Sequence, residues 1–413
     1  MTTGTPAGTW VLGGCQSDFA RNRSREGEGF DALTAEVVAG ALADAGVQAA
    51  DIDMVHVANA FGQLFTGQGH LGAMPATVDP DLWGRPASRH EAACASGSVA
   101  LLAATAELEA GRYDVALVVG VELERTVPGD DAARHLGAAS WVGHEGEPRY
   151  VWPAAFSDVA AEYDRRYGLD DAHLHAFAEL AYRNARTNPL AQTREWRFGP
   201  HSFTDDPDAN PVVEGRTRRN DCSQVTDGGA AVVLASDRWV RDHPEVLRAG
   251  RAARIVGWGH RTVGLPLAPK LERSRTDTHV LPHVRDTFAD ALRRARLGSV
   301  DDLHGVEVHD CFAASGYLAI DHLGITAPGD SWKAIEAGEI ERDGRIPVNP
   351  SGGLIGGGHP VGATGVRMVL DAARQVTGRA EGTQVAGATR FGTLNIGGST
   401  ATTCSFILEG PAS

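Results

Sequence analysis

The sequence predicts an α/β protein that is built from two similar halves. Three kinds of segment occur in the same order in both: a helix leading into a strand, a small-residue turn that opens an apolar helix, and a Gly-Gly turn that feeds a strand. The helix and strand of residues 31–61 match those of residues 282–312. The turn and helix after Cys94 match the turn and helix after His359, and the Gly-Gly turn and strand from Asp227 match those from Asn395. An ordered repeat of this kind is typical of a duplicated unit. We expect halves at about residues 1–250 and 251–413.

The first pair is the clearest. Residues 31–61 contain the helical pattern TAEVVAGALADAG and then the strand pattern DMVHVANAF. Residues 282–312 contain VRDTFADALRRARLG and then VEVHDCF. The two stretches align almost without gaps, so we expect each to form a helix followed by a strand.

The next elements are buried ones. The segment DVALVVGV, from Asp114, is apolar on both faces, as strands in a covered sheet are. The helix that follows Cys94, within ASGSVALLAA, is apolar almost all round. We therefore expect this helix to be covered on every side, as a helix between two sheets is.

The pattern breaks at about residues 122–222. This stretch contains Trp141, Trp152 and Trp196, many His and Arg residues, and one helical pattern around 155–187. The second half has no counterpart of this size. We interpret it as an insertion that forms a lid over the substrate pocket; a loop that only stabilises a dimer or decorates the surface is the alternative.

Composition excludes several classes of function. The net charge of −15 argues against nucleic acid or an anionic membrane as partner. No apolar run of about 20 residues is present, and the polar start MTTGTPAGTWVLGG does not resemble a signal peptide. The five cysteines are odd in number, widely spaced and without a C-x-x-C pair, which argues against a disulfide frame or a metal site. A reducing cytoplasm fits best.

Cys94 and His359 are the first candidates for chemistry. Cys94 lies in HEAACASGS, where backbone amides and the start of a helix would lower the pKa of a thiol. His359 lies in the glycine-rich stretch NPSGGLIGGGHPVGATG, which can bring an imidazole to a reacting centre as general base. Taken singly, a packed core cysteine and an incidental histidine are the ordinary alternatives.

Two further motifs lie in the second half. In EVHDCF, strand alternation places His309 and Cys311 on one side and Asp310 on the other. In NIGG, which begins at Asn395, we expect a turn whose amides could bind an oxyanion. Alone, each is compatible with a structural role.

Together the four motifs resemble the thiolase superfamily, and within it the sterol-carrier-protein-type thiolases. They are Cys94-Ala95-Ser96, His309-Asp310-Cys311-Phe312, Gly358-His359-Pro360 and Asn395-Ile396-Gly397. The resemblance covers essentially the whole chain. It implies a five-layered αβαβα fold, usually a homodimer or a dimer of dimers, that acts on acyl-CoA and CoA without a permanently bound cofactor or metal.

The resemblance also implies roles for these residues. Cys94 would be the nucleophile that holds the acyl group, and His359 its activator. His309 would hold a water in an oxyanion hole, and the amides of Cys94 and Gly397 would form a second hole. The common thiolases have a second catalytic Cys where this chain has Asn395, so Cys311 is the candidate for the proton at the α-carbon.

Other functions remain open at this point. They are a C- or O-acyltransferase of secondary metabolism, a retro-aldol lyase, and a non-catalytic acyl-CoA-binding protein.

The CoA phosphates need basic residues as partners. Arginines are plentiful in and near the insertion, but the sequence does not show which of them would bind CoA. They include Arg183, Arg186, Arg216, Arg218 and Arg219. Small OB-fold proteins accompany some relatives, so an accessory subunit is a further possibility.

Overall fold

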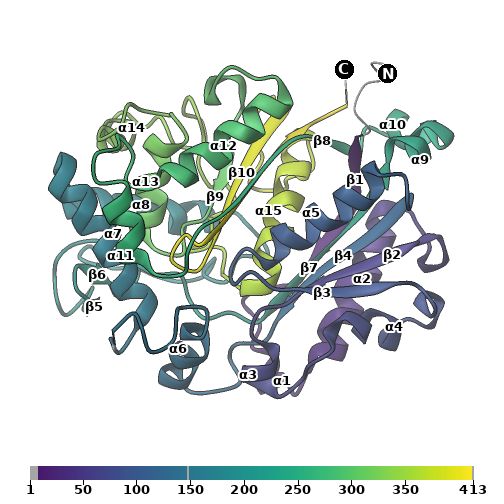
Figure 1. Cartoon of the computed structure of the whole chain (residues 1–413), viewed down its shortest axis with the longest axis horizontal. Coiled ribbons are helices and arrows are strands. Elements are labelled where there is room, and N and C mark those ends of the chain that lie inside the picture. Colours follow the sequence, from purple (N-terminus) through teal and green to yellow (C-terminus); the bar gives the residue numbers. More distant parts are fainter. Residues whose placement is uncertain (1–7, 147, 412–413) are drawn as a thin grey trace.

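The computed structural model describes residues 8–146 and 148–411, and a nine-stranded sheet runs through it (Figure 1). The strand order is β3-β2-β4-β7-β1-β8-β11-β10-β9. The strands are β1 Thr9–Gln16, β2 Met54–Ala58, β3 Ala87–His90, β4 Val115–Glu122, β7 Gly228–Ser236, β8 Ala253–Thr262, β9 Val306–Val308, β10 Arg390–Gly397 and β11 Thr402–Glu409. A separate hairpin pairs β5 (Val212–Glu214) with β6 (Thr217–Arg218).

The helices cover both faces of this sheet. Their bounds are α1 Arg23–Glu26, α2 Phe30–Ala45, α3 Gly62–Thr66, α4 Met74–Val78, α5 Ser96–Glu109, α6 Gly129–Gly137, α7 Val151–Tyr167, α8 Asp171–Ala185, α9 Asp237–Asp242, α10 Pro244–Arg248, α11 Leu267–Arg273, α12 Pro282–Ala295, α13 Ala313–His322, α14 Ser331–Glu336 and α15 Val361–Val376. In the described part of the chain, no helix is both long and apolar enough to span a bilayer.

The sheet is nearly symmetric about its middle. There β1 and β8 pair antiparallel through only three residue pairs. On one side follow β7, β4 and β2, and on the other their counterparts β11, β10 and β9. The matched segments of the sequence fall on matched elements: α2 and β2 with α12 and β9, α5 with α15, and β7 with β11. The two similar halves are therefore present in the fold.

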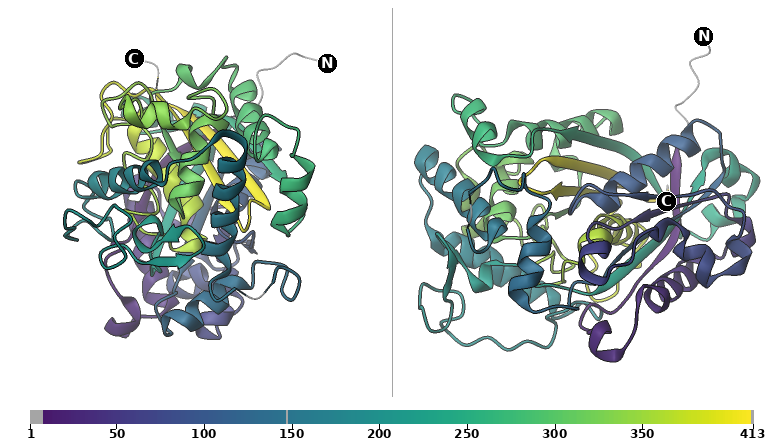
Figure 2. Two further views of the ribbon diagram at one scale, coloured as in Figure 1. Left: turned by 90° about the vertical axis from the view of Figure 1, so that its left-hand side faces the viewer. Right: turned by 60° about the horizontal axis from the view of Figure 1, so that its bottom comes forward.

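The elements stack in five layers. α2 packs on β1, β7 and β4 from one outer side, and α12 packs on β8 and β11 from the other. Between the two halves of the sheet lie α5 and α15, which pack against each other and against strands of both halves (Figures 1 and 2). This is the αβαβα arrangement that the resemblance implied.

One expectation about the inner layer is wrong. The helix covered on every side is α15, which is buried along almost its whole length. α5 is buried only on the face that contains Ala100, Leu101 and Ala104, and Leu102 and Ala106 on its other face reach solvent. An apolar sequence alone could not tell the two apart, because α5 packs mainly on the first half of the sheet whereas α15 is enclosed by both halves.

The insertion also differs in detail. The single helix expected around 155–187 is two helices, α7 and α8. Gly168 ends α7 with φ 80° and ψ 141°, a conformation that side chains disfavour. The side chain of Asp170 then caps α8 by accepting the Ala172 N–H. Both helices pack on α13, so the insertion is attached to the second half.

The turn expected at NIGG is shorter than predicted. Asn395–Gly397 are the last residues of β10, and the turn to β11 begins at Gly398. The reason is register: Asn395 and Gly397 pair with Cys404 and Thr402 across the hairpin, so the ladder continues to its end.

Candidate active site

Two helix starts bring Cys94 and His359 together. Cys94 lies two residues before α5, and His359 two residues before α15. The helices cross closely at Gly97, where a Cβ atom would lie 2.7 Å from the backbone nitrogen of Val366. Carbon and backbone nitrogen cannot pack that tightly, so the small residues of ASGS and GATG are what allow the two catalytic candidates to meet.

The turn before the nucleophile candidate is strained. Ala93 has φ 51°, in the left-handed region that a non-glycine residue rarely adopts. The hydroxyl of Ser96 braces this turn, since it accepts the Ala92 N–H and donates to the Ala93 carbonyl. Strain of this kind costs about 1–3 kcal/mol and persists only where surrounding structure holds it. The consequence is a fixed direction for the Cys94 side chain.

Cys94, His309 and His359 form one cluster. The Cys94 sulfur and one ring nitrogen from each histidine all lie within 4.8 Å of one another. The two imidazole rings meet edge to face, with centroids 5.2 Å apart. Among the described residues this is also the one group spaced to hold a metal ion. Its hydrogen bonds, described next, suit proton transfer.

The hydrogen bonds assign the tautomer of His359. Its Nδ1 lies 2.7 Å from the Thr364 hydroxyl, and that hydroxyl donates its proton to the Pro360 carbonyl. Nδ1 must therefore carry the ring proton, which leaves Nε2 with a free lone pair. Burial, followed by the charge of Arg367, lowers the pKa of His359 to about 3, so the ring is neutral. A neutral ring with an open Nε2 can accept a proton from a thiol.

His309 has the opposite tautomer. The Asn395 side chain accepts a hydrogen bond from the Ser98 hydroxyl through Oδ1 (2.8 Å), and its Nδ2 donates to His309 Nδ1 (3.0 Å). His309 Nδ1 is thus an acceptor, and Nε2 carries the proton. Burial and the charge of His359 lower the pKa of His309 well below its usual value. Its Nε2–H is therefore a neutral donor suited to an oxyanion or a water.

Asn395 has a further contact in the cluster. Its Nδ2 lies 3.2 Å from the Cys94 carbonyl. The Asn395 side chain therefore ties the turn at Cys94 to His309. By the resemblance, the common thiolases have a catalytic cysteine at the position of Asn395. In this chain the position is structural support for the site.

Cys311 lines the same cavity as Cys94 and His359. It is buried, and burial, followed by the charge of Cys94, raises the pKa of its thiol well above the usual value. Asp310 points elsewhere, since its carboxylate accepts the Leu354 N–H of the glycine-rich loop. The strand expected to continue through EVHDCF ends at Val308, so the different directions of Asp310 and Cys311 come from the segment after β9 and not from strand alternation.

The pKa expected for Cys94 is wrong in direction. Burial, followed by the Glu124 carboxyl, raises the pKa of the Cys94 thiol to about 12. The amides of Gly398 and Cys94 act in the opposite sense, but they do not outweigh burial. The amides that act on the sulfur are thus those of Cys94 and of Gly398, which lies one residue beyond the expected Gly397. At neutral pH the resting pair is a thiol and a neutral imidazole.

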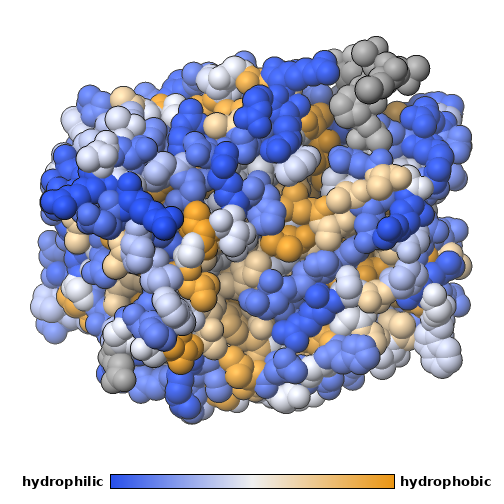
Figure 3. Space-filling model, viewed as in Figure 1, coloured by the Kyte–Doolittle hydropathy of each residue, from blue (hydrophilic) through white to orange (hydrophobic). Residues whose placement is uncertain are grey.

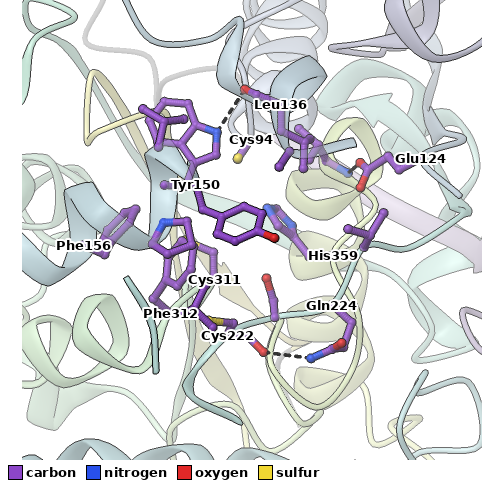
Figure 4. A pocket seen from close by; sticks show the side chains of 18 of the residues that line it. Cys94, Glu124, Leu136, Tyr150, Phe156, Cys222, Gln224, Cys311, Phe312 and His359 are labelled. Atoms are coloured by element: carbon purple, nitrogen blue, oxygen red, sulfur yellow. Dashed lines mark hydrogen bonds between the residues drawn. The ribbon is translucent and has the colours of Figure 1, made fainter. Parts of the chain in front are cut away.

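A cavity of about 270 Å³ leads to these residues (Figure 4). Its wall is largely apolar and aromatic, and the segment 122–222 supplies much of it through α6 and α7. Residues of this wall include Phe61, Leu136, Tyr150, Trp152, Phe156 and Phe312. The insertion therefore does shape the pocket, as expected of a lid.

Basic residues near the insertion differ in their availability. Arg183 pairs with Glu341, Arg216 with Asp164 and Asp171, and Arg218 with Asp205. Arg219 is exposed, lines the cavity and has no carboxylate partner among the described residues. It marks the mouth of the cavity.

Sequence reasoning missed Glu122 and Glu124 of the segment VELE; Glu122 is the last residue of the buried strand β4, and Glu124 lies two residues beyond it. Glu122 accepts the Ala60, Phe61 and Gly362 amides, and Glu124 accepts the Val361 amide. Both thus cap the first turn of α15, directly after His359. Two acidic residues next to an otherwise apolar run were the available signal.

Comparison with known proteins finds similar chains along most of the sequence. The chain matches the family described as "Thiolase, N-terminal domain" over residues 11–195 and "Thiolase C-terminal domain-like" over residues 270–410. It is 33% identical to an acetyl-CoA acetyltransferase of Methanothermobacter thermautotrophicus, over 92% of this chain and 94% of that one. It is 26% identical to human sterol carrier protein 2, over 92% of this chain and 68% of that one.

Solved structures share the fold at lower identity. Human mitochondrial 3-ketoacyl-CoA thiolase in complex with CoA superposes with a TM-score of 0.73 at 18% identity, covering 98% of each chain. The Ltp2–ChsH2(DUF35) aldolase superposes with a TM-score of 0.76 at 21% identity, covering 99% of each. At these identities the likeness concerns the fold.

Proposed function

The chain belongs to the thiolase family, in its sterol-carrier-protein type, and we propose that it cleaves or forms 3-ketoacyl-CoA thioesters through an acyl group held on Cys94. It is a thiolase-type acyltransferase; the lyase and non-catalytic alternatives are not favoured. One observation carries the proposal: the Cys94 sulfur and a nitrogen of each of His309 and His359 lie within 4.8 Å of one another, beside a cavity.

The first step is attack by Cys94. His359 Nε2 takes the thiol proton, and the sulfur bonds to the ketone carbon of the substrate. Because the thiol has a raised pKa and the imidazole a lowered one, this transfer is unfavourable until the substrate is present. Backbone amides at Cys94 and at Gly397 or Gly398 would stabilise the oxyanion, each by about 3–4 kcal/mol.

The second step breaks the carbon–carbon bond. Its electrons move onto the released thioester as an enolate, which needs a donor at its oxygen. His309 Nε2–H, directly or through a water, is that donor. The neutral Cys311 thiol then gives its proton to the α-carbon and becomes a thiolate.

The third step returns the enzyme. The incoming CoA thiol gives its proton to Cys311, and its sulfur attacks the acyl group on Cys94. Cys94 leaves and takes its proton back from His359. Condensation of two acyl-CoA molecules is the same sequence in reverse.

Arg219 is the candidate for the CoA phosphates. Its exposed position at the cavity mouth and the absence of a carboxylate partner among the described residues leave its guanidinium available. The other four arginines named above stay unassigned. CoA is a substrate here, and no permanently bound cofactor is proposed.

A homodimer is the oligomeric state we propose. β3 is an edge strand of the sheet and α5 beside it is only partly covered. Figure 3 shows apolar residues gathered near a hollow on this face, where a second cavity is lined by Leu64, Val99 and Leu265, among others. Light scattering of the purified chain should give twice 43.5 kDa, or four times for a dimer of dimers. A monomer would refute this.

We also propose where the protein acts in the cell and with which partner. A cytoplasmic enzyme of acyl-CoA or lipid metabolism fits the five free cysteines. A small OB-fold accessory protein is proposed as a further partner, and co-purification from the native host would test it.

The direct assay is CoA-dependent cleavage of a short 3-ketoacyl-CoA. Wild-type protein should cleave at most one substrate per chain without CoA, which leaves the acyl group on Cys94, and should turn over repeatedly only when CoA is present. Cys94→Ala should lose activity by about 10⁴-fold or more, and His359→Asn by about 10²–10⁴-fold. Repeated turnover in the absence of CoA, or full activity in Cys94→Ala, would contradict the proposal.

A further inference from the structure

Glu124 is the one carboxyl group among the residues that line the catalytic cavity in the described part of the chain. It follows β4, is 1% exposed, and turns its carboxyl end toward the cavity (Figure 4). The neighbouring wall is apolar: Phe61 and Val361 belong to one buried cluster, and Leu136 and Cys94 pack against it. A carboxyl group in such a wall requires an explanation, since the thioester chemistry above does not use it.

Glu124 shares its surroundings with a second buried carboxyl group, that of Glu122. Glu122 accepts four hydrogen bonds at 2.8–3.1 Å, from Asn59 Nδ2 and the amides of Ala60, Phe61 and Gly362. Burial raises the pKa of Glu122 to about 7, and these four donors act against that rise by stabilising the carboxylate. Glu122 is therefore the member of the pair that ionises more readily.

Glu124 has fewer donors. Its Oε1 accepts the Val361 amide at 2.8 Å, and the Thr226 amide is the other backbone donor near it. Burial, followed by the charge of Glu122, raises the pKa of Glu124 well above its usual value, and Asp227 acts in the same direction. With fewer donors than Glu122, Glu124 holds its proton more firmly, and the protonated carboxyl group carries an O–H donor. Enzymes keep buried acids neutral for this purpose elsewhere.

Glu124 lies toward the acyl end of the cavity. It is the ionisable side chain whose charge acts most strongly on Cys94, the proposed acyl carrier. Arg219 lines the same cavity but is exposed, and it is the candidate proposed above for the CoA phosphates. A substrate that reaches Cys94 therefore brings its acyl group, rather than its CoA, next to Glu124.

We propose that Glu124 determines substrate specificity by donating a hydrogen bond to an oxygen on the acyl group. This inference rests on the proposed function. The preferred substrates are then 3-ketoacyl-CoA thioesters whose chain carries a hydroxyl, ether or carbonyl oxygen beyond the ketone. A plain alkyl chain leaves the Glu124 donor without an acceptor, and a site built around a polar contact discriminates against the analogue that lacks it.

The test compares chains of equal length. One 3-ketoacyl-CoA has a plain alkyl chain, and in its partners an ether oxygen replaces, in turn, each methylene that is not bonded to a carbonyl carbon. Wild-type protein should cleave at least one ether isomer with kcat/KM about 10- to 100-fold above the alkyl parent. Glu124→Gln should retain most of this preference because the amide also donates. Glu124→Leu should abolish or reverse it.

Leu136→Met is the matched control. This substitution changes the shape of the same cavity wall without adding a hydrogen-bond donor. The kcat/KM values for the alkyl and ether substrates should therefore change by the same factor. A wild-type enzyme that prefers the alkyl chain over every ether isomer would overturn the inference, as would a ratio that Glu124→Leu leaves unchanged.

The readout also separates this inference from the proposed function. A ratio of kcat/KM values for two substrates does not depend on how much of a variant is folded. If no substrate acylates Cys94, the proposed function itself fails. If Cys94 is acylated but the ratio is near one in all variants, only the role of Glu124 fails.

Discussion

At the scale of single residues, the site is a set of neutral groups held in complementary states. His359 presents an open Nε2 and His309 a protonated one, because Thr364 and Asn395 fix the opposite edges of the rings. The thiols of Cys94 and Cys311 both have raised pKa values. In such a site, charged species form only during the reaction, when the negative charge develops on an oxygen of the bound substrate.

Cys311 gives the sharpest test at this scale. Cys311→Ala should still acquire an acyl group on Cys94, because the attack needs only Cys94 and His359. It should exchange the α-protons of acetyl-CoA with solvent deuterium about 10²- to 10⁴-fold more slowly, as expected for loss of an acid–base group. Mass spectrometry of acetyl-CoA recovered from D₂O measures this rate. Cys222→Ala, which removes another thiol of the same cavity, is the control. Wild-type exchange in Cys311→Ala would refute the role given to Cys311.

The sequence indicated most of these residues but not their states. Cys94, His309, Cys311 and His359 stood out because each lies at the end of a matched element. The pKa of Cys94 could not be predicted, since it depends on burial by segments far away in the sequence. Glu124 was missed for the same reason: its role depends on Val361, 237 positions later.

At the scale of elements, the crossing of α5 and α15 positions the chemistry. Gly97→Ala would place a methyl group 2.7 Å from the Val366 nitrogen and push the helices apart. We expect a loss of about 1–3 kcal/mol in unfolding free energy and a larger loss in kcat than the stability change explains. Urea unfolding with parallel kinetics measures both.

Gly298→Ala is the control for that prediction. A Cβ there would lie 3.5 Å from the nearest atom, an ordinary contact, so stability and activity should stay near wild type. If Gly97→Ala behaved like Gly298→Ala, the crossing would not be what holds Cys94 and His359 in place.

Element boundaries show what a local pattern can predict. α2, α12 and β4 lie where their hydrophobic patterns placed them. The break between α7 and α8 was missed because it depends on the backbone conformation of Gly168 within a continuous helical pattern. The exposure of α5 was missed because burial depends on which neighbours a helix has, and two apolar helices look alike in sequence.

At the scale of the whole molecule, duplication explains the site. Two similar halves meet at β1 and β8, and their inner helices start near one point. The first half supplies Cys94, and the second half supplies His309, Cys311 and His359. The domain boundary at about residue 250 remains a prediction of the sequence repeat, as does the extent of the insertion at 122–222.

The central claim is that a covalent acyl group forms on Cys94. Acid quench of the protein with a 3-ketoacyl-CoA in the absence of CoA, followed by peptide mass mapping, tests it most directly. The account predicts one acyl group per chain, on the peptide that contains Cys94, which disappears when CoA is added and is absent from Cys94→Ala. An acyl group on Cys311 or Cys222 instead, or turnover with no adduct on any cysteine, would contradict it.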